Sequence, residues 1–330
     1  YMNIIIINTG SSSIKFQMLA MPDQKVICSG LVDRIGLGSS NLVYETQNTK
    51  VQEVLDIDNH EAGLKKIAEL LIDPKIGVIK DTSEITAVGH RVVHGERFSD
   101  PMKITEKVKE KIKDLFLLAP LHNPAHLQGI NVAEEIFSDA EHIAVFDTAF
   151  VQTIPEVAHK YAIPNEIADK YHIRQYGFHG TSHKFVSERA IEFLGVKESK
   201  IITIHLGNGC SITAVKDGKS IDHSMGFSPA NGLIMGTRSG DIDHSVVFYL
   251  NDLGFSVKEI SDLLQKKSGM LGLTGYSDLR DIERLAEEGN KDCLLALAMN
   301  AYRIKKFIGS YTAAMGGLDA IVFTAGVGEN

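Results

Sequence analysis

The sequence contains few cysteines and no long apolar run. Its three cysteines, Cys28, Cys210 and Cys293, are far apart, which fits a reducing cytoplasm better than a disulfide framework. No apolar run approaches the roughly 20 residues that span a bilayer, and the run Ile4 to Ile7 has the length of a strand. We therefore expect no membrane segment and no secretory leader. A composition of 44% hydrophobic and 23% charged residues also excludes collagen-like and disordered classes.

The sequence also lacks an excess of positive charge. Its 34 basic residues face 42 acidic ones, for a net charge of −8. The Lys-rich stretch Lys103 to Lys113 alternates with acids, as is typical of the solvent face of a helix. We therefore expect no nucleic-acid partner. If the ligand is an anion, a few well-placed arginines must bind it.

Two segments share a strand–turn–strand pattern. The first runs from Ile4 through a Gly/Ser turn at 8–13 into Ile14 to Leu19, and the second occupies 201–216. The similarity predicts an internal duplication, with domains at 1–150 and 151–330, although two unrelated hairpins would look alike at this length. Apolar residues recur at helical spacing in 64–71, 104–116, 185–194 and 292–314. Strands that alternate with helices predict α/β layers.

Three glycine-rich turns follow predicted strands, at 8–13, 207–211 and 326–330. Small residues let consecutive backbone N–H groups approach an anion, so these turns could hold phosphate. Each could equally be a tight turn without a ligand. None matches the Walker A pattern or a G-x-G-x-x-G after a strand, which argues against a P-loop NTPase and a Rossmann dehydrogenase.

Two arginines lie among small or apolar neighbours, Arg91 in GHRVVHG and Arg238 in GTRSGDID. The planar guanidinium suits carboxylate and phosphate oxygens. Alternatively, each could brace a loop by pairing with a nearby acid, such as Asp241 or Asp243 for Arg238. Asp147 ends an apolar strand, where it could orient water or metal, or cap the next turn.

His179 and His183 are four residues apart, a spacing that allows a zinc site on one helix face. However, Gly180 follows His179 directly, so we expect His179 to precede the helix and Thr181 or Ser182 to cap it. The zinc hypothesis is the weaker one, because the Glu of a metalloprotease helix is absent.

Together these motifs resemble the acetate kinase family. The similar segments are NTGSSSIK (8–15), GHRVVHG (89–95), LAPLHNP (118–124), FDTAF (146–150), YGFHGTSH (176–183), HLGNGCSITAVKDGKSID (205–222), MGTRSGDID (235–243) and GVGEN (326–330). The resemblance implies a duplicated, ribonuclease-H-like (actin-like) α/β fold with the nucleotide in the cleft between the domains. It implies phosphoryl transfer from ATP to acetate with Mg²⁺ or Mn²⁺, in a cytoplasmic homodimer.

The resemblance also implies roles, position by position. Arg91 and Arg238 bind the carboxylate substrate and the transferring phosphoryl group, His179 donates a hydrogen bond to that group, and His122 lines the same site. Asp147 and Asn8 belong to the phosphate and magnesium environment. The residues implied to bind nucleotide are Lys15, His205, Asn208, Gly209, Asp278, Leu279, Arg280, Gly326, Gly328 and Asn330. Those implied to form a small apolar pocket for the acyl methyl are Val93, Leu121, Phe178 and Pro229.

The sequence departs from the family pattern at several positions. These are Thr9, Glu96, His244, Leu279 and the run 228–232. None removes a catalytic side chain, but substrate preference and adenosine affinity stay open. Val93 favours acetate over propionate, because propionate kinases tend to carry a smaller residue there. A non-catalytic ATP-binding scaffold of the same fold is the alternative from another class. Family members continue past GVGEN, so we expect a magnesium-associated Glu and the segment that closes the first domain to lie beyond Asn330.

Overall fold

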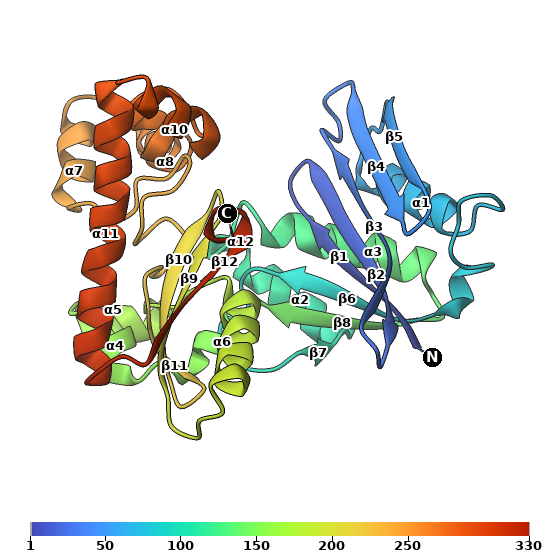
Figure 1. Ribbon diagram of the computed structural model, residues 1–330, viewed down its shortest axis with the longest axis horizontal. Helices are drawn as coiled ribbons and strands as arrows, with labels where there is room; N and C mark the ends of the chain where they lie inside the picture. The colour runs from blue at the N-terminus through green and yellow to red at the C-terminus, as the bar shows by residue number, and fades with distance from the viewer. Residues whose placement is uncertain (1, 330) are drawn as a thin grey trace. The chain divides into compact units, whose positions relative to one another are not determined.

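A computed structural model describes residues 2–329, and the chain divides after Ala149 into two compact units (Figure 1). Each unit is built on its own β-sheet. The elements of the first unit are β1 (Met2–Thr9), β2 (Ser13–Met21), β3 (Lys25–Asp33), β4 (Ser40–Thr46), β5 (Lys50–Leu55), α1 (His60–Leu71), η1 (Thr82–Glu84), β6 (Ile85–Val92), β7 (Met102–Lys103), α2 (Glu106–Asp114), η2 (Leu115–Leu117), α3 (Asn123–Ile136) and β8 (Glu141–Phe146).

The first sheet has eight strands in the order β5-β4-β3-β2-β1-β6-β8-β7. Strand β1 is antiparallel to β2 and parallel to β6, and β6 is parallel to β8. The carboxyl ends of β1, β6 and β8 therefore meet at one edge of the sheet, where ligands bind in open α/β sheets. The Asp147 N–H donates to the Val92 carbonyl at 3.0 Å, which fixes the residue after β8 beside the end of β6.

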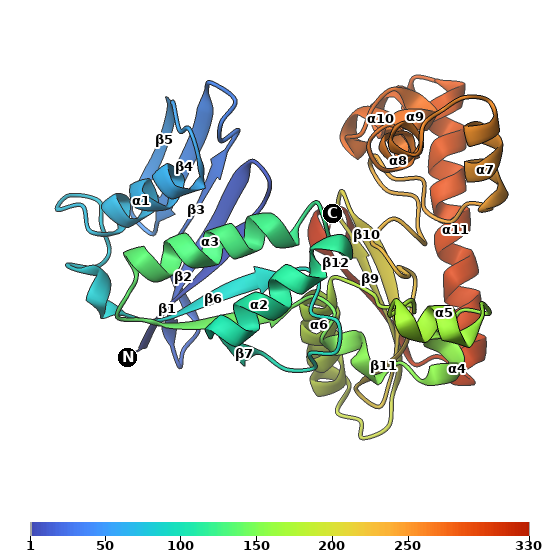
Figure 2. The same cartoon turned by 180° about the vertical axis from the view of Figure 1, so that it is seen from behind.

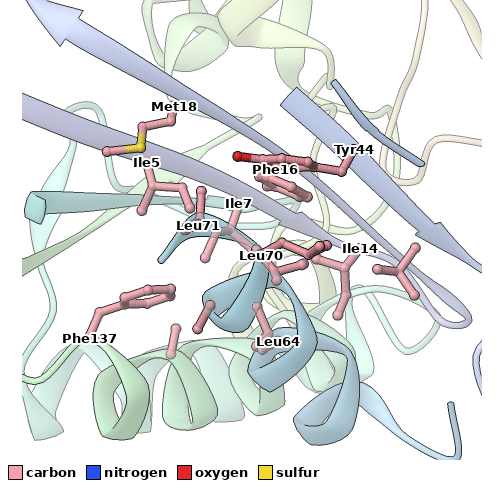
Figure 3. Close-up of a cluster of buried hydrophobic side chains, with 14 of the residues drawn as sticks. Ile5, Ile7, Ile14, Phe16, Met18, Tyr44, Leu64, Leu70, Leu71 and Phe137 are labelled. Atoms are coloured by element: carbon pink, nitrogen blue, oxygen red, sulfur yellow. The ribbon is translucent and has the colours of Figure 1, made fainter. Parts of the chain in front are cut away.

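Helices α1 and α3 cover one face of this sheet (Figure 2). Ile5 and Ile7 of β1 point into the core, where they meet Leu64 and Leu71 of α1 (Figure 3). Although the run Ile4 to Ile7 is entirely apolar, Ile6 is 43% exposed. Because side chains alternate across a strand, only one face of β1 is covered by helices.

The helix predicted at 104–116 is shorter than expected. Thr105 is its N-cap and accepts from the Val108 N–H at 3.3 Å, so Ile104 precedes the helix. After Asp114 the chain tightens into the 3₁₀ turn η2, which takes Leu115 and Phe116 out of α2.

The second unit repeats the strand arrangement of the first. Its elements are η3 (Phe150–Thr153), α4 (Glu156–His159), α5 (Asn165–Lys170), α6 (Gly180–Leu194), β9 (Lys200–Leu206), β10 (Cys210–Lys216), β11 (Lys219–His223), α7 (Ser245–Asp252), α8 (Val257–Lys266), α9 (Gly269–Thr274), α10 (Leu279–Glu287), α11 (Lys291–Met315), β12 (Ala320–Thr324) and α12 (Ala325–Gly328). The four-stranded sheet has the order β11-β10-β9-β12. Strand β9 is antiparallel to β10 and parallel to β12, as β1 is to β2 and β6.

Helix α6 ends at Gly195, which adopts the left-handed conformation common at helix C-termini, but the buried face of α6 differs from the predicted apolar stripe. The buried residues of α6 are Gly180, His183 and Ser187, whereas Phe185 is 56% exposed. The fully buried positions of α6 are therefore small or polar, while Val186, Ala190 and Ile191 of the predicted stripe are half-buried. Helix α11 packs against β9 and β10, and among residues 2–329 no helix combines the length and apolar character that a bilayer crossing requires.

Candidate active site

In the first unit, Arg91 and Asp147 form a two-point ion pair. Arg91 lies near the end of β6 and Asp147 directly after β8; Nε donates to Oδ1 at 2.9 Å and Nη2 to Oδ2 at 2.7 Å. Asp147 is only 2% exposed, and its carboxylate raises the pKa of Arg91. Arg91 therefore pairs with an acid, which is one of the two alternatives that the sequence left open. The pair orients the Arg91 guanidinium.

Helix α3 starts beside this ion pair. The Asn123 side chain accepts from the His94 N–H at 3.1 Å and donates to the His94 carbonyl at 3.0 Å, which fastens the first turn of α3 to the segment after β6. These bonds fix His122, the residue before the helix. One turn on, His126 is buried near Arg91, and burial lowers the pKa of His126 to about 4.

Asn8 and Lys15 lie side by side on the hairpin of β1 and β2, where they are register partners. Both line a cavity of ≈ 460 Å³ on the sheet face opposite α1 and α3, with Ile6, Gln17 and Glu45.

Of the residues implied to form the acyl pocket, Val93 is buried at 3% exposure, whereas Leu121 is 51% exposed. The acyl pocket implied by the resemblance therefore stays a prediction.

In the second unit, His179 caps α6 with a left-handed backbone, at φ 56° and ψ 24°. Neither Thr181 nor Ser182 is the N-cap, so that prediction was wrong, while the expectation that His179 precedes the helix is confirmed. A non-glycine residue in this region is strained and persists where its surroundings enforce it. The strain points to a requirement for the imidazole at this place.

A hydrogen-bonded chain holds the His179 ring. His179 Nδ1 lies 2.8 Å from Ser211 Oγ, which also lies 2.7 Å from His183 Nε2, and His183 Nδ1 lies 2.7 Å from Thr203 Oγ1. Complete burial lowers the pKa of His183 well below its usual range, so His183 is neutral. The contact between Nδ1 and Ser211 fixes the orientation of the His179 ring.

His205 of β9 stacks on His179, with ring centroids 4.1 Å apart, and its Nδ1 lies 2.9 Å from Ser182 Oγ. His223 closes the cluster: it accepts from the Met225 N–H through Nδ1 and donates from Nε2 to the Phe178 carbonyl at 2.7 Å. This pair of bonds fixes a neutral tautomer of His223 and positions Phe178, the residue before His179.

Gly209 brings His179 and Arg238 to one place. A Cβ at Gly209 would lie 3.4 Å from His179 Nε2 and 3.9 Å from Arg238 Nη1. The absence of a side chain at Gly209 therefore leaves an open space that both an imidazole and a guanidinium border. This space adjoins the 207–209 turn, which is closed by a hydrogen bond from the Gly207 N–H to the Gly209 carbonyl at 3.1 Å.

Arg238 has no carboxylate partner in the part of the chain that the structure describes. Its Nη1 donates to the Pro229 carbonyl at 3.2 Å and contacts the Met235 sulfur at 3.8 Å. Asp241 instead accepts from the Gly232 N–H, and Asp243 from the Ser245 N–H. The loop-bracing alternative is thus wrong for Arg238. Burial lowers the pKa of Arg238, but a guanidinium stays charged at neutral pH and favours an anionic ligand.

A cavity of ≈ 280 Å³ opens next to the 207–209 turn. Asn208, Asp278 and Leu279, three of the implied nucleotide-binding residues, line it. Asp278 is also the N-cap of α10, and its ion pair with Arg280 lowers the pKa of the carboxyl to about 2. A side chain at Gly236 would collide with Asn208 Oδ1, so Gly236 keeps Asn208 in place.

The third predicted glycine-rich turn is a short helix. Residues Ala325–Gly328 form α12 after β12, and Val327 between Gly326 and Gly328 lines the same cavity. The chain turns helically here because the Glu329 N–H donates to the Ala325 carbonyl at 2.9 Å. Asn330 lies outside the described residues.

Within residues 2–329, no group of three or more His, Cys, Asp or Glu side chains is arranged to hold a metal. The zinc hypothesis for His179 and His183 therefore has no support. Asn8 lies near the end of β1 and Asp147 directly after β8, at the same edge of the sheet with β6 between them. Such a small set suits Mg²⁺, which keeps several waters and binds through one or two protein oxygens plus phosphate.

Sequence reasoning missed Ser211 and Asn300. In the sequence, Ser211 is only one residue of a small-residue turn. Its hydrogen bonds to His179 and His183 form because β9 and β10 pair beside α6. Asn300 lies within a helix and lines the ≈ 280 Å³ cavity. No local pattern marks either position.

A model of the Acetokinase family matches residues 3–330. The chain is 67% identical to the acetate kinase of Flavobacterium johnsoniae over 331 residues, covering all of this chain and 84% of that protein. The crystal structure of Porphyromonas gingivalis acetate kinase matches with a TM-score of 0.94 and 47% identity, over 100% of this chain and 84% of that one. A propionate kinase from Francisella tularensis matches with a TM-score of 0.96 and 44% identity, over 100% and 85%.

Proposed function

The chain belongs to the acetokinase family, and we propose that it catalyses reversible, direct in-line transfer of the γ-phosphoryl group of ATP to acetate, which gives acetyl phosphate and ADP. It is a phosphotransferase with a carboxyl-group acceptor and has the actin-like fold of that family.

The acceptor needs no general base. A carboxylate has a reference pKa near ~4 and is already ionised at neutral pH, unlike the hydroxyl of a sugar. Asp147 accepts hydrogen bonds from Nε and Nη2 of Arg91. We accordingly assign Asp147 to the orientation of Arg91 rather than to proton abstraction. This role suits a site that contains cations and hydrogen-bond donors.

The difficulty of the reaction is to bring two anions together. Negative charge on the transferring group must be compensated in the transition state, and preorganised donors are the usual means. We assign Arg238 and Arg91 to the carboxylate and the phosphoryl oxygens. Arg238 suits this role because no acid neutralises it among the described residues, so an incoming anion is its natural partner.

We assign to His179 the donation of a hydrogen bond from Nε2 to the phosphoryl group. Ser211 holds the opposite ring nitrogen at 2.8 Å, which sets the tautomer and the direction of the ring. His122 is assigned to the same site from the first unit.

The nucleotide is proposed to occupy the ≈ 280 Å³ cavity, with its phosphates at Asn208 and Gly209. Mg²⁺ or Mn²⁺, when bound, supplies charge compensation on the phosphates. Asn8 directly, and Asp147 through water, are the side chains that would hold it.

A second acceptor, propionate, is favoured by one observation: the match to a solved propionate kinase is as close as the match to an acetate kinase. One methylene in an apolar pocket changes specificity by only about 1–3 kcal/mol. Val93 is buried and bulky enough to favour the smaller acid, so we propose acetate as the preferred acceptor and propionate as a slower one.

We further propose that the protein works as a cytoplasmic homodimer. The three free cysteines and the use of ATP suit that compartment. For the dimer, the second unit carries exposed large apolar side chains on α7 and α11, among them Phe248, Tyr249 and Tyr302.

One observation carries the proposed function: Arg238, which has no carboxylate partner among the described residues, and the oriented His179 border one open space at Gly209, near the ≈ 280 Å³ cavity. The test is a hydroxylamine trap for acyl phosphate with ATP, Mg²⁺ and acetate, propionate or butyrate in turn. Acyl hydroxamate should form fastest with acetate. Its absence with all three acids would instead favour the non-catalytic scaffold.

A further inference from the structure

Asn300 lies in the middle of α11 and lines the ≈ 280 Å³ cavity. It follows Cys293 and Ala296 on the buried face of the helix, at the spacing of successive turns. Its Oδ1 atom is buried and has no hydrogen-bond partner among residues 2–329. A residue that lines the cavity therefore carries an amide oxygen whose hydrogen-bonding capacity is unsatisfied.

A buried amide oxygen without a hydrogen-bond partner is unusual inside a protein. Buried polar groups are nearly always paired, and an exception calls for an explanation such as a missing ligand. One turn further on, Arg303 also faces the protein, but its guanidinium donates to the Gly232 carbonyl at 3.0 Å. Packing alone would be satisfied better by Ala or Leu at position 300, since both favour a helix more than Asn does.

The rest of the cavity shows which part of a ligand Asn300 meets. Polar groups for phosphate and ribose lie at Gly207, Asn208 and Asp278. The lining also includes the Ser277 hydroxyl, the Cys210 thiol and five apolar side chains, namely those of Ile234, Met235, Met270, Leu279 and Val327. A flat heteroaromatic base suits the apolar walls, and the Asn300 amide is a polar group that could contact the edge of that base.

We propose that the Asn300 amide recognises the adenine base, accepting from its 6-amino group through Oδ1 and donating to N7 through Nδ2. An asparagine amide pairs with adenine in this two-point manner. A 6-oxo purine such as guanine or hypoxanthine presents acceptors at both positions, so Oδ1 would face another oxygen. Asn300 thereby selects adenine nucleotides. This inference rests on the proposed use of ATP.

The test compares Asn300→Leu and Asn300→Ala with the wild type and with Asn131→Leu, a matched control at an exposed helix position in the first unit. Calorimetry gives the Kd of ADP and of IDP, which differ only at the purine 6-position and its ring proton. The hydroxamate assay gives KM and kcat with ATP, ITP and 2′-deoxy-ATP. Thermal unfolding without nucleotide monitors the fold.

The wild type and the control should bind ADP at least about tenfold more tightly than IDP, the effect of one two-point pair. Both Asn300 variants should lose most of this preference, mainly through weaker ADP binding, with kcat within about twofold. Their unfolding midpoints should not fall, because the buried amide oxygen accepts no hydrogen bond among the described residues without a ligand.

An unchanged ADP-to-IDP ratio in a folded variant would overturn the proposal, and so would a wild type that does not distinguish the two. A changed ratio of ATP to 2′-deoxy-ATP alone would assign Asn300 to the ribose and overturn it equally. If no acyl phosphate forms in any sample, the proposed function fails, while the binding ratio still decides on Asn300.

Discussion

Arg91 and Asp147 face each other across the ends of β6 and β8 through two hydrogen bonds, of 2.9 and 2.7 Å. Among the described residues, the Arg238 guanidinium of the second unit, by contrast, donates only to a carbonyl and a sulfur. One arginine is thus held rigidly by a buried carboxylate, and the other is left to attract an anion. Arg91 and Arg238 have similar neighbours in the sequence, but among the described residues only Arg91 is held by a carboxylate.

Asp147→Asn should lower kcat by about 10²–10³, comparable to the loss of one preorganised transition-state donor. The amide keeps the size of the side chain but removes the charge that orients Arg91. The matched control is Glu141→Gln at the other end of β8, whose partner Lys103 lies on the surface. Steady-state hydroxamate rates check this, and wild-type turnover in a folded Asp147→Asn would remove Asp147 from the mechanism.

Ser211→Ala should lower kcat about tenfold with little change in KM for acetate, because His179 loses the group that fixes its ring. Ser220→Ala is the matched control, since Ser220 is equally buried and its hydroxyl has no partner. Full rate parameters for both variants check the prediction. Equal kcat for the two would show that Ser211 does not position His179.

Gly209→Ala should keep the fold and lose activity. The added methyl would be in ordinary contact with its neighbours, yet it would fill the space between His179 and Arg238. The control is Gly309→Ala in α11, where a Cβ meets nothing within 4 Å. That change should stabilise the protein by about 0.5–1 kcal/mol. Thermal unfolding and hydroxamate rates are measured together, and normal turnover in Gly209→Ala would mean that the reaction occurs elsewhere.

The protein should lose stability as the pH falls below about 6.5. Burial lowers the pKa of His90 to about 3, and that of His94, His126 and His223 to about 4. The unfolded chain takes up these protons near pH 6.5, its reference value, whereas the folded chain does not. Acid therefore favours the unfolded state, at about 1.4 kcal/mol per pH unit for each histidine within that window.

Urea unfolding at pH 7.5 and 5.5 checks this prediction. His90→Asn should show a smaller loss between the two pH values than the wild type, and the exposed control His244→Asn should match the wild type. A free energy of unfolding that stays constant or rises on acidification would contradict the assignment of neutral buried histidines.

Much of the framework could be predicted from local sequence. The two hairpins, the left-handed stop at Gly195 and the position of His179 before its helix follow from short patterns of apolar and small residues. The family resemblance added the fold and the activity, which periodicity alone could not name.

What could not be predicted depends on distant residues. The partner of Arg91 lies 56 positions away, and only the parallel pairing of β6 and β8 brings it near. The unsatisfied amide of Asn300 is invisible in the sequence, because a lack of partners is a property of the packed structure. The exposed face of α6 was missed for the same reason: apolar spacing marks a face, but not what covers it.

The most direct measurement is the rate of acetyl hydroxamate formation from ATP, Mg²⁺ and acetate by the wild type, Arg238→Ala and the exposed control Arg284→Ala. The wild type and the control should turn over equally, and Arg238→Ala should be slower by about 10³-fold or more, as when other phosphoryl transferases lose an arginine. Its unfolding midpoint should stay the same or rise, because the change removes a half-buried cation without a carboxylate partner. A folded Arg238→Ala with wild-type turnover would contradict the account.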